Sequence, residues 1–370
     1  MRVKLKDITK FSKGTQINGK NLIDDGAYSY LNGGINPSGK WNEFNVAENT
    51  VTISEGGNSS GYVNYMNDAF WCGAHCYYLY DGPKNSKYLY YALKSQQERL
   101  FRIRSGACMP NIKKSDLGNF IIEYEKDEVR QEEVVKVLEK CELLIGDYNK
   151  KLTLLDEAVR ARFVEMFGDP VINSCQFPVQ PMTDICDIID GDRGKNYPKS
   201  EEILDDGYCL FLNAKNVTQK GFDFENCNFI TREKDDALRN GKLSRGDVVL
   251  TTRGTVGNLA YYSKNVPYEN IRINSGMVIL RMNRSILNEI YFIELFKMKL
   301  SDIKEKIASG SAQPQLPIST MNKIILMIPP LELQNQFASF VQEIDKSRLR
   351  ELLAIKQIKL LLNDSWLLLY

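Results

Sequence analysis

The chain of 370 residues contains the same ordered series of short motifs twice. Residues 24–32 read DDGAYSYLN, and residues 205–213 read DDGYCLFLN. A Ser-Gly pair at 105–106 returns at 309–310, and each copy continues into an aliphatic run. A repeat of roughly 180 to 200 residues is much longer than the 20- to 50-residue units of solenoid proteins. The sequence therefore predicts two copies of a whole domain, and with them two similar sites.

The second repeated feature is a long amphipathic segment at residues 128–167 and again at 331–370. Apolar residues recur in both at spacings of three and four, the pattern of a helical face. A helix of forty residues would be about 60 Å long, too long for a small domain to bury. We therefore expect the two helices to pair antiparallel as a coiled coil; a helix broken near Gly146 is the alternative. The residues expected at the helix-pair interface are Val134, Leu138, Cys141, Ile145, Leu152, Leu155, Val159, Phe337, Val341, Ile344, Leu352, Ile355 and Leu362.

Each half of the chain reads as a β-rich domain followed by a long helix. Short runs separated by Gly, Asn, Asp and Pro indicate strands and turns, while residues 88–104 and 291–307 read as helices. The predicted fold class is α+β, with two similar β-rich domains, two long antiparallel helices and an internal pseudo-twofold repeat. The expected boundaries are 1–126 and 169–330 for the β-rich domains, and 127–168 and 331–370 for the helices.

Composition indicates an ordinary cytoplasmic protein. The N-terminus lacks the apolar core of a signal peptide, and no run of 18 apolar residues is present, so no membrane partner is expected. The eight cysteines have no regular spacing, which favours reduced thiols over a disulfide framework. Net charge is only +1, but basic residues outnumber acidic ones in the first domain. That local excess is compatible with DNA binding and does not establish it.

The sequence offers little catalytic chemistry. The one histidine, His75, lies in the run CGAHC at 72–76, which has three possible zinc ligands. No fourth ligand is near in sequence, and the matching residues 275–279 contain none, so a buried strand is the better interpretation of the run. We expect no catalytic residue, no metal and no cofactor in this chain.

Several glycine-rich turns carry side chains that are suited to DNA. Residues 254–257, GTVG, follow an apolar run and Arg253; they lack the ending of a phosphate-binding P-loop, so a tight turn between strands is expected. Arginine, lysine, asparagine and glutamine on such turns can contact phosphates or base edges. For each residue taken singly, however, a solvated loop residue is the better interpretation, and Arg253 could pair with Asp247. The candidate DNA-binding residues are Lys13, Gln16, Asn18, Lys20, Arg193, Lys195, Asn196, Arg253, Thr255, Gln313 and Gln315.

The duplicated assembly resembles the specificity subunit of type I restriction-modification systems. The resemblance covers the whole chain and is carried by three motifs: IPPLELQ at 328–334, FGDP at 167–170 and GDVVLTTRGTVG at 246–257. The first copy departs from the pattern, because Glu123-Tyr124-Glu125 replaces the Pro-Pro helix entry and residues 54–57 replace the arginine turn.

The resemblance implies a DNA reader without catalytic activity of its own. Each β-rich domain would be a target recognition domain that reads one half of a split sequence in double-stranded DNA. The helices would set the spacing and dock two methyltransferase subunits, which would bind S-adenosylmethionine and methylate adenine at N6. Restriction and motor subunits would complete the complex.

Three other classes of protein remain open from the residues alone. The chain could be a protein-binding scaffold with twin β domains and a dimerising coiled coil. It could be the recognition module of another kind of restriction enzyme. An enzyme in its own right fits least, because no paired catalytic site recurs in both halves.

Overall fold

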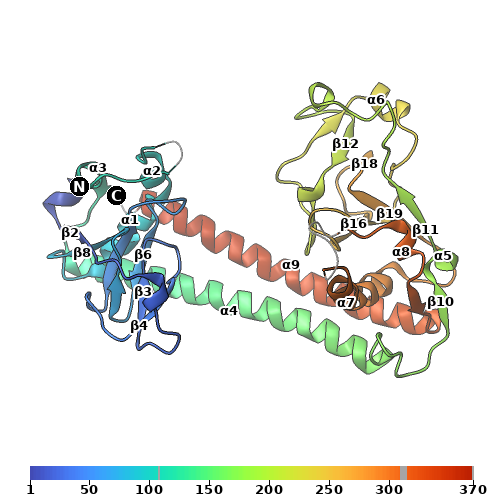
Figure 1. The fold of residues 1–370 in the computed structure, drawn as a ribbon, viewed down its shortest axis with the longest axis horizontal. Coiled ribbons are helices and arrows are strands. Elements are labelled where there is room, and N and C mark those ends of the chain that lie inside the picture. Colours follow the sequence, from blue (N-terminus) through green and yellow to red (C-terminus); the bar gives the residue numbers. More distant parts are fainter. Residues whose placement is uncertain (107–108, 309–314, 369–370) are drawn as a thin grey trace. The chain divides into compact units, whose positions relative to one another are not determined.

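The computed structural model describes residues 1–106, 109–308 and 315–368, and the chain forms two compact units. Unit 1 comprises residues 1–150 and 351–370, and unit 2 comprises residues 151–350. Each unit therefore holds a β-rich region together with part of helix α4 (Glu128–Phe167) and part of helix α9 (Leu331–Leu368) (Figure 1).

Unit 1 is built on a four-stranded antiparallel sheet in the order β2-β8-β5-β6. A three-stranded sheet, β4-β3-β7, lies in the same unit, and its β3–β7 pair is parallel. A short antiparallel pair, β1–β9, adjoins the start of α4. The strands are β1 (Arg2–Lys4), β2 (Lys10–Lys13), β3 (Tyr28–Leu31), β4 (Gly39–Trp41), β5 (Thr50–Ser54), β6 (Val63–Met66), β7 (Phe70–Cys72), β8 (Cys76–Tyr80) and β9 (Ile121–Glu123).

Unit 2 repeats these three sheets in the same strand order and adds a short antiparallel pair, β13–β14. Its four-stranded sheet has the order β11-β19-β16-β17, and its three-stranded sheet has the order β15-β12-β18 with β12–β18 parallel. The pair β10–β20 matches β1–β9, so the predicted internal repeat is confirmed. The strands are β10 (Val179–Pro181), β11 (Cys186–Asp190), β12 (Cys209–Leu212), β13 (Val217–Thr218), β14 (Gly221–Phe222), β15 (Phe229–Ile230), β16 (Val248–Thr251), β17 (Leu259–Tyr261), β18 (Ile271–Ile273), β19 (Met277–Met282) and β20 (Ile325–Met327).

The shorter helices confirm one prediction and correct another. The helix expected at 291–307 is present as α7, but the segment 88–104 forms two helices, α1 and α2. The Ser95 hydroxyl donates to the carbonyl of Ala92 at 2.9 Å, a side-chain bond that competes with helix continuation. The shorter helices are α1 (Ser86–Lys94), α2 (Gln97–Arg102), α3 (Lys114–Gly118), α5 (Met182–Ile185), α6 (Arg232–Ala237), α7 (Glu289–Ala308) and α8 (Ile318–Met321).

Helix α4 is unbroken through Gly146, and it pairs antiparallel with α9 inside each unit. In unit 2, Asp156 of α4 lies 2.6 Å from Arg348 of α9, while Phe163, further along α4, packs edge-on against Phe337, near the start of α9. The order of contacts is thus reversed between the two helices. In unit 1, Leu362 of α9 joins the core cluster that contains the first turns of α4. The predicted antiparallel pair is therefore correct.

One residue assigned to the helix-pair interface is on the solvent side. Leu352 is 44% exposed, whereas its neighbour Glu351 is only 6% exposed. Polar side chains at Arg348 and Glu351 continue the three-four spacing of the inner face, so the apolar pattern placed Leu352 wrongly. The other assigned residues are buried (Val134, Leu138, Val159, Phe337, Val341, Ile355) or partly buried (Cys141, Ile145, Leu152, Leu155, Ile344, Leu362).

A buried glutamine anchors the start of each long helix. Gln334 donates to the carbonyls of Pro329 at 2.8 Å and Ile286 at 3.0 Å, and its side-chain oxygen accepts from the amide of Asn288. Gln131 occupies the matching turn of α4 and donates to the carbonyl of Glu125 at 2.6 Å. The bonds of Gln334 fix α9 to the β-rich region of unit 2, because a buried amide is costly without partners. The bond of Gln131 holds the start of α4 to the segment that precedes it.

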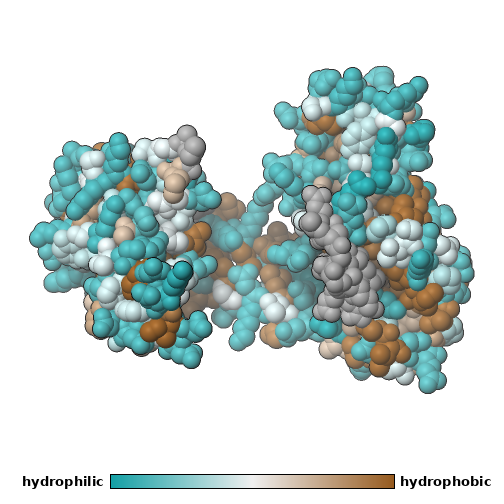
Figure 2. Space-filling view, in the orientation of Figure 1, coloured by the Kyte–Doolittle hydropathy of each residue, from teal (hydrophilic) through white to brown (hydrophobic). Residues whose placement is uncertain are grey.

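Hydrophilic residues cover most of the visible face of the β-rich region of unit 1 (Figure 2). Several exposed large apolar residues lie instead on the long helices, among them Leu143 (70%), Leu154 (54%), Leu349 (58%) and Leu353 (55%). Within the described residues, no helix has the length and apolar character needed to cross a membrane.

Candidate nucleic-acid interface

The two units share one backbone arrangement at the end of their central strands. In unit 1, the amide of Glu55, which follows β5, donates to the carbonyl of His75 at 2.9 Å, and the carbonyl of Glu55 accepts from Ile112. In unit 2, the amide of Thr252, which follows β16, donates in the same way to Gly276, and its carbonyl accepts from Leu316. We call this place the strand-end site of each unit.

The strand-end site of unit 2 contains an exposed arginine. Arg253 pairs through its backbone with Gln315, and both side chains are exposed. Arg253 and Gln315 line a pocket of about 240 Å³ together with Arg193. The predicted tight turn is confirmed, since residues 254–257 connect the antiparallel strands β16 and β17, with positive φ angles at both glycines.

Asp247 is not the partner of Arg253. Its buried carboxylate is bound by Arg281, with the closest contact at 2.7 Å, and the side chain of Arg253 has no carboxylate partner within the described part of the chain. A free guanidinium on a rigid turn can donate two hydrogen bonds to guanine or bind a phosphate. Gln315 beside it carries the amide that pairs with adenine.

A buried aspartate that the sequence did not point to holds the neighbouring turn. Asp192 accepts from the amides of Gly194 and Arg239, both at 2.7 Å. These backbone bonds, with the guanidinium of Arg239, lower the pKa of the Asp192 carboxyl. The turn presents Arg193, whose guanidinium donates to Asp190 at 3.1 Å and to the carbonyl of Ser275 at 3.3 Å.

The remaining candidates of unit 2 divide into exposed and engaged side chains. Lys195 and Thr255 are exposed. Asn196 donates to the carbonyl of Ala237 at 2.9 Å, so its amide supports the turn. Gln313 lies outside the described residues.

Among the candidates of unit 1, only Lys13 reaches the strand-end site. Its ammonium lies 2.6 Å from the carboxylate of Glu55. Gln16 donates to the carbonyl of Ile17, and Asn18 accepts from the amide of Lys20 to start a short 3-10 turn. Lys20 is exposed.

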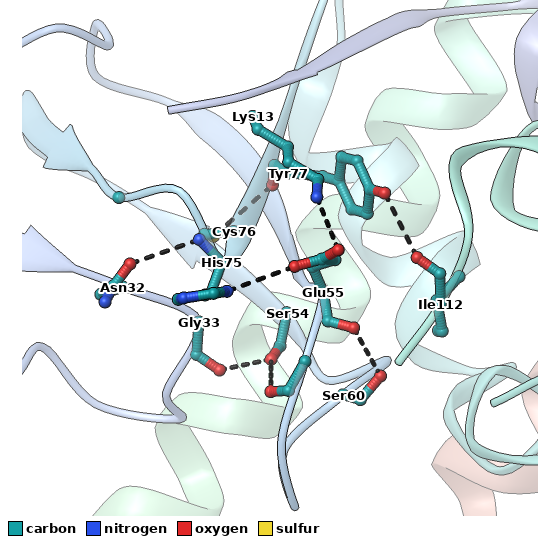
Figure 3. A network of polar contacts seen from close by, with 12 residues as sticks. Lys13, Asn32, Gly33, Ser54, Glu55, Ser60, His75, Cys76, Tyr77 and Ile112 are labelled. Atoms are coloured by element: carbon teal, nitrogen blue, oxygen red, sulfur yellow. Dashed lines mark hydrogen bonds and ion pairs between the residues drawn. The ribbon is translucent and has the colours of Figure 1, made fainter. Parts of the chain in front are cut away.

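Figure 3 shows that Glu55 lies at the centre of a polar network in unit 1, between Lys13 and His75. Its carboxylate is 15% exposed and the imidazole of His75 is 62% exposed. From the sequence alone, His75 was expected in a buried strand, with zinc binding as the less favoured interpretation. Comparing the hydrogen-bond pattern of the two copies identifies both residues, whereas motif inspection of one copy does not.

The run at 72–76 is not the buried strand that was expected. Cys72 ends β7, Cys76 begins β8, and the residues between them form the connecting turn. The turn lies tight against the loop at 32–33, since a Cβ atom on Gly73 would approach the Asn32 side chain to 2.2 Å. No metal-binding group of three or more ligands occurs within the described ranges.

A buried ion-pair network supports the outer part of unit 2. Asp235 is fully buried, and it binds Arg272 and, at 2.5 Å, Lys242. Burial alone would raise the pKa of Asp235, but hydrogen bonds from Lys242 and Arg272 outweigh burial and lower it. The network joins α6 to β18 and therefore has a structural role in unit 2.

Comparisons with known proteins agree with this architecture. A chain from Mycoplasma genitalium assigned as a type I specificity subunit is 28% identical over 353 residues, covering 90% of this chain and 84% of that one. The specificity subunit of the type I restriction enzyme MjaIX of Methanocaldococcus jannaschii is 26% identical over 297 residues, covering 74% of this chain and 66% of that one. The crystal structure of a type I restriction-modification S subunit from M. genitalium shares the fold, with a TM-score of 0.62, 21% identity and coverage of 99% and 94%.

The profile of the type I restriction modification DNA specificity domain matches residues 1–154 and 177–360. These two matches include both strand-end sites and most of both long helices. The two matched segments also agree with the sheet order that the two units share. This chain therefore belongs to the family of type I restriction-modification DNA specificity subunits.

Proposed function

We propose that each unit reads one half of a bipartite sequence in double-stranded DNA and that the chain itself catalyses nothing. One observation carries the proposal: two strand-end sites share the same backbone bonds and present different side chains. Two sites with the same backbone geometry and different hydrogen-bonding side chains are suited to two different half-sites. The target recognition domains of this proposal are residues 1–126 and 169–330, with spacers at 127–168 and 331–370.

The long helices would set the distance between the two half-sites. A helix of forty residues extends about 60 Å. At about 3.4 Å per base pair along the duplex, this length limits the centres of the half-sites to fewer than roughly 18 base pairs apart.

The exposed leucines on the same helices supply apolar area for partner subunits. We propose two methyltransferase subunits there, which would bind S-adenosylmethionine and methylate adenine at N6. Restriction and motor subunits would join this complex to cleave unmodified DNA. The present chain would contribute sequence recognition and geometry to these reactions.

In unit 2 we assign Arg253 to a base and Lys195 and Thr255 to phosphates. The test is methylation mapping on a random DNA pool, with this chain assembled with its methyltransferase subunits. Arg253→Ala should weaken binding by about 1 to 3 kcal/mol and relax one position of one half-site. If Arg253 holds a phosphate instead, binding should weaken evenly over all sequences and the salt slope should fall by about one.

Lys264→Ala is the matched control, because it removes one exposed positive charge from the same unit outside the strand-end site. It should leave the mapped sequence unchanged. An assembled complex that shows no preference among the DNA sequences of the pool would refute the proposed function and favour a protein-binding scaffold.

A further inference from the structure

The strand-end site of unit 1 contains a histidine whose ring is oriented by an acidic residue. Nδ1 of His75 lies 3.4 Å from one oxygen of Glu55, and the other oxygen lies 2.6 Å from the ammonium of Lys13 (Figure 3). The amide of His75 donates to the side chain of Asn32 at 3.3 Å. Both the backbone and the ring of His75 are therefore held, while the ring itself remains mostly exposed.

The turn that carries His75 has little freedom to move. Gly33 has a φ of +86°, and a Cβ atom there would approach the carbonyl of His75 to 2.2 Å. Glu55 is fixed as well, since its carbonyl accepts from the Ser60 hydroxyl at 2.8 Å in addition to the backbone bonds of the site. A rigid, exposed polar side chain is what direct reading of a base edge requires.

The equivalent positions of unit 2 carry different chemistry. Gly276 takes the place of His75 and Thr252 the place of Glu55, as the matching backbone bonds establish. Register in the two sheets places Asp190 opposite Val278 where Lys13 lies opposite Tyr77. Unit 2 thus lacks the acid-histidine pair and presents Arg253 from the next residue along the chain.

We propose that His75 determines specificity in unit 1, by accepting a hydrogen bond at Nε2 from the exocyclic amino group of adenine or cytosine. Glu55, a pure acceptor when ionised, selects in the neutral imidazole the form with its proton on Nδ1, and Nε2 is then the acceptor. In the major groove, only adenine N6 and cytosine N4 offer a donor, whereas guanine presents N7 and O6 acceptors. Glu55 acts as a positioning residue, and Lys13 balances its charge. This inference rests on the proposed function.

The test compares methylation maps of complexes assembled with the wild-type chain, His75→Ala and Glu55→Ala. His75→Ala should relax one adenine- or cytosine-containing position in one half-site, with discrimination there reduced about tenfold to a hundredfold, as for the loss of one good base contact. The half-site that Arg253→Ala affects should stay unchanged. Lys84→Ala, at the opposite end of β8 from the strand-end site, is the control and should change neither half-site.

A second measurement separates the reading role from a structural one. His75 is the only histidine of the chain, so ¹⁵N-histidine labelling of this subunit gives the Nδ1 and Nε2 resonances of a single imidazole in the assembled complex. Cognate DNA should shift the Nε2 resonance, and DNA mutated at the relaxed position should not. Glu55→Ala should change the ring's tautomer signal before DNA is added and relax the same position.

The outcomes distinguish this inference from the function on which it rests. An unchanged map and unchanged affinity for His75→Ala, with Arg253→Ala still altering its own half-site, would overturn the role of His75 and leave DNA reading intact. A uniform loss of affinity over all sequences would assign His75 to a phosphate and would also overturn it. A wild-type complex that shows no preference among DNA sequences would refute the proposed function itself.

Discussion

Truncation of Phe337 should destabilise unit 2 strongly. Phe337 lies in the first turns of α9 and is fully buried; its ring contacts Phe163 at 5.4 Å and Phe167 at 5.6 Å between centroids. Removal of a buried phenylalanine side chain typically costs about 3 to 5 kcal/mol. Two aromatic pairs are lost at the same time, each worth about 0.5 to 1.5 kcal/mol beyond buried area. We therefore expect Phe337→Ala to lower the free energy of unfolding by about 4 to 5 kcal/mol, near the upper end of the range for such truncations.

Leu349→Ala is the matched control, because it truncates an apolar residue of the same helix and the same unit that is 58% exposed. Its effect on the free energy of unfolding should stay within about 0.5 kcal/mol. Urea unfolding of the full chain measures both variants. Circular dichroism follows both units, whereas tryptophan fluorescence follows unit 1, which contains all three tryptophans of the chain.

Phe337→Ala should therefore move the circular dichroism transition to lower urea more than the fluorescence transition. A free energy of unfolding within about 1 kcal/mol of that of Leu349→Ala would refute the reasoning. It would mean that the aromatic cluster does not hold α9 against α4 in unit 2.

Ile355→Asp should cost several kcal/mol, because it places an unpaired charge at a buried position; Leu352→Asp, at 44% exposure, should cost little, and equal urea midpoints for the two variants would contradict the assigned helix face. Deleting four residues from each long helix removes about 6 Å and should shorten the spacer by about two base pairs of about 3.4 Å. Altered half-site bases in the methylation map, with an unchanged spacer, would refute the proposal that the long helices set the spacing. The lowered pKa of Asp192 means that this carboxylate stabilises the folded state above its unfolded pKa of about 3.9, and that the contribution disappears as pH falls through the folded pKa. The stability difference between wild type and Asp192→Asn should therefore shrink as urea midpoints are measured from pH 6 down to pH 3; a constant difference would contradict the assignment.

The spacing of apolar residues predicted the two long helices well, but it did not predict which polar residues lie on their inner faces. The spacing of apolar residues sufficed for α4 and α9, because a long amphipathic helix repeats its signal over many turns. Leu352 was misplaced, since Arg348 and Glu351 occupy inner positions that apolar spacing cannot reveal. The short run at 72–76 has no periodicity that separates a buried strand from a turn closed by glycine contacts.

The candidate site depended on contacts between segments distant in sequence. Arg253 stood out because glycines follow it, but its pairing with Gln315 joins residues 62 positions apart. Glu55 carried no motif, and the run CGAHC around His75 indicated only a buried strand or a zinc site, whereas their pairing arises from the strand register between β5 and β8. Asp192 is hidden for the same reason, because its partner Arg239 lies beyond four strands in the chain.

The matching backbone bonds of the two strand-end sites bear on how such a protein can evolve. The bonds from Glu55 to His75 and from Thr252 to Gly276 run between main-chain atoms, so they impose no side-chain identity on either position. Mutation can exchange an acid for a hydroxyl, or an imidazole for a hydrogen atom, while strand register and the apolar core stay unchanged. Selection for a new recognition sequence can therefore act on these positions with little cost in folding stability. Each half of the chain can diverge independently of the other.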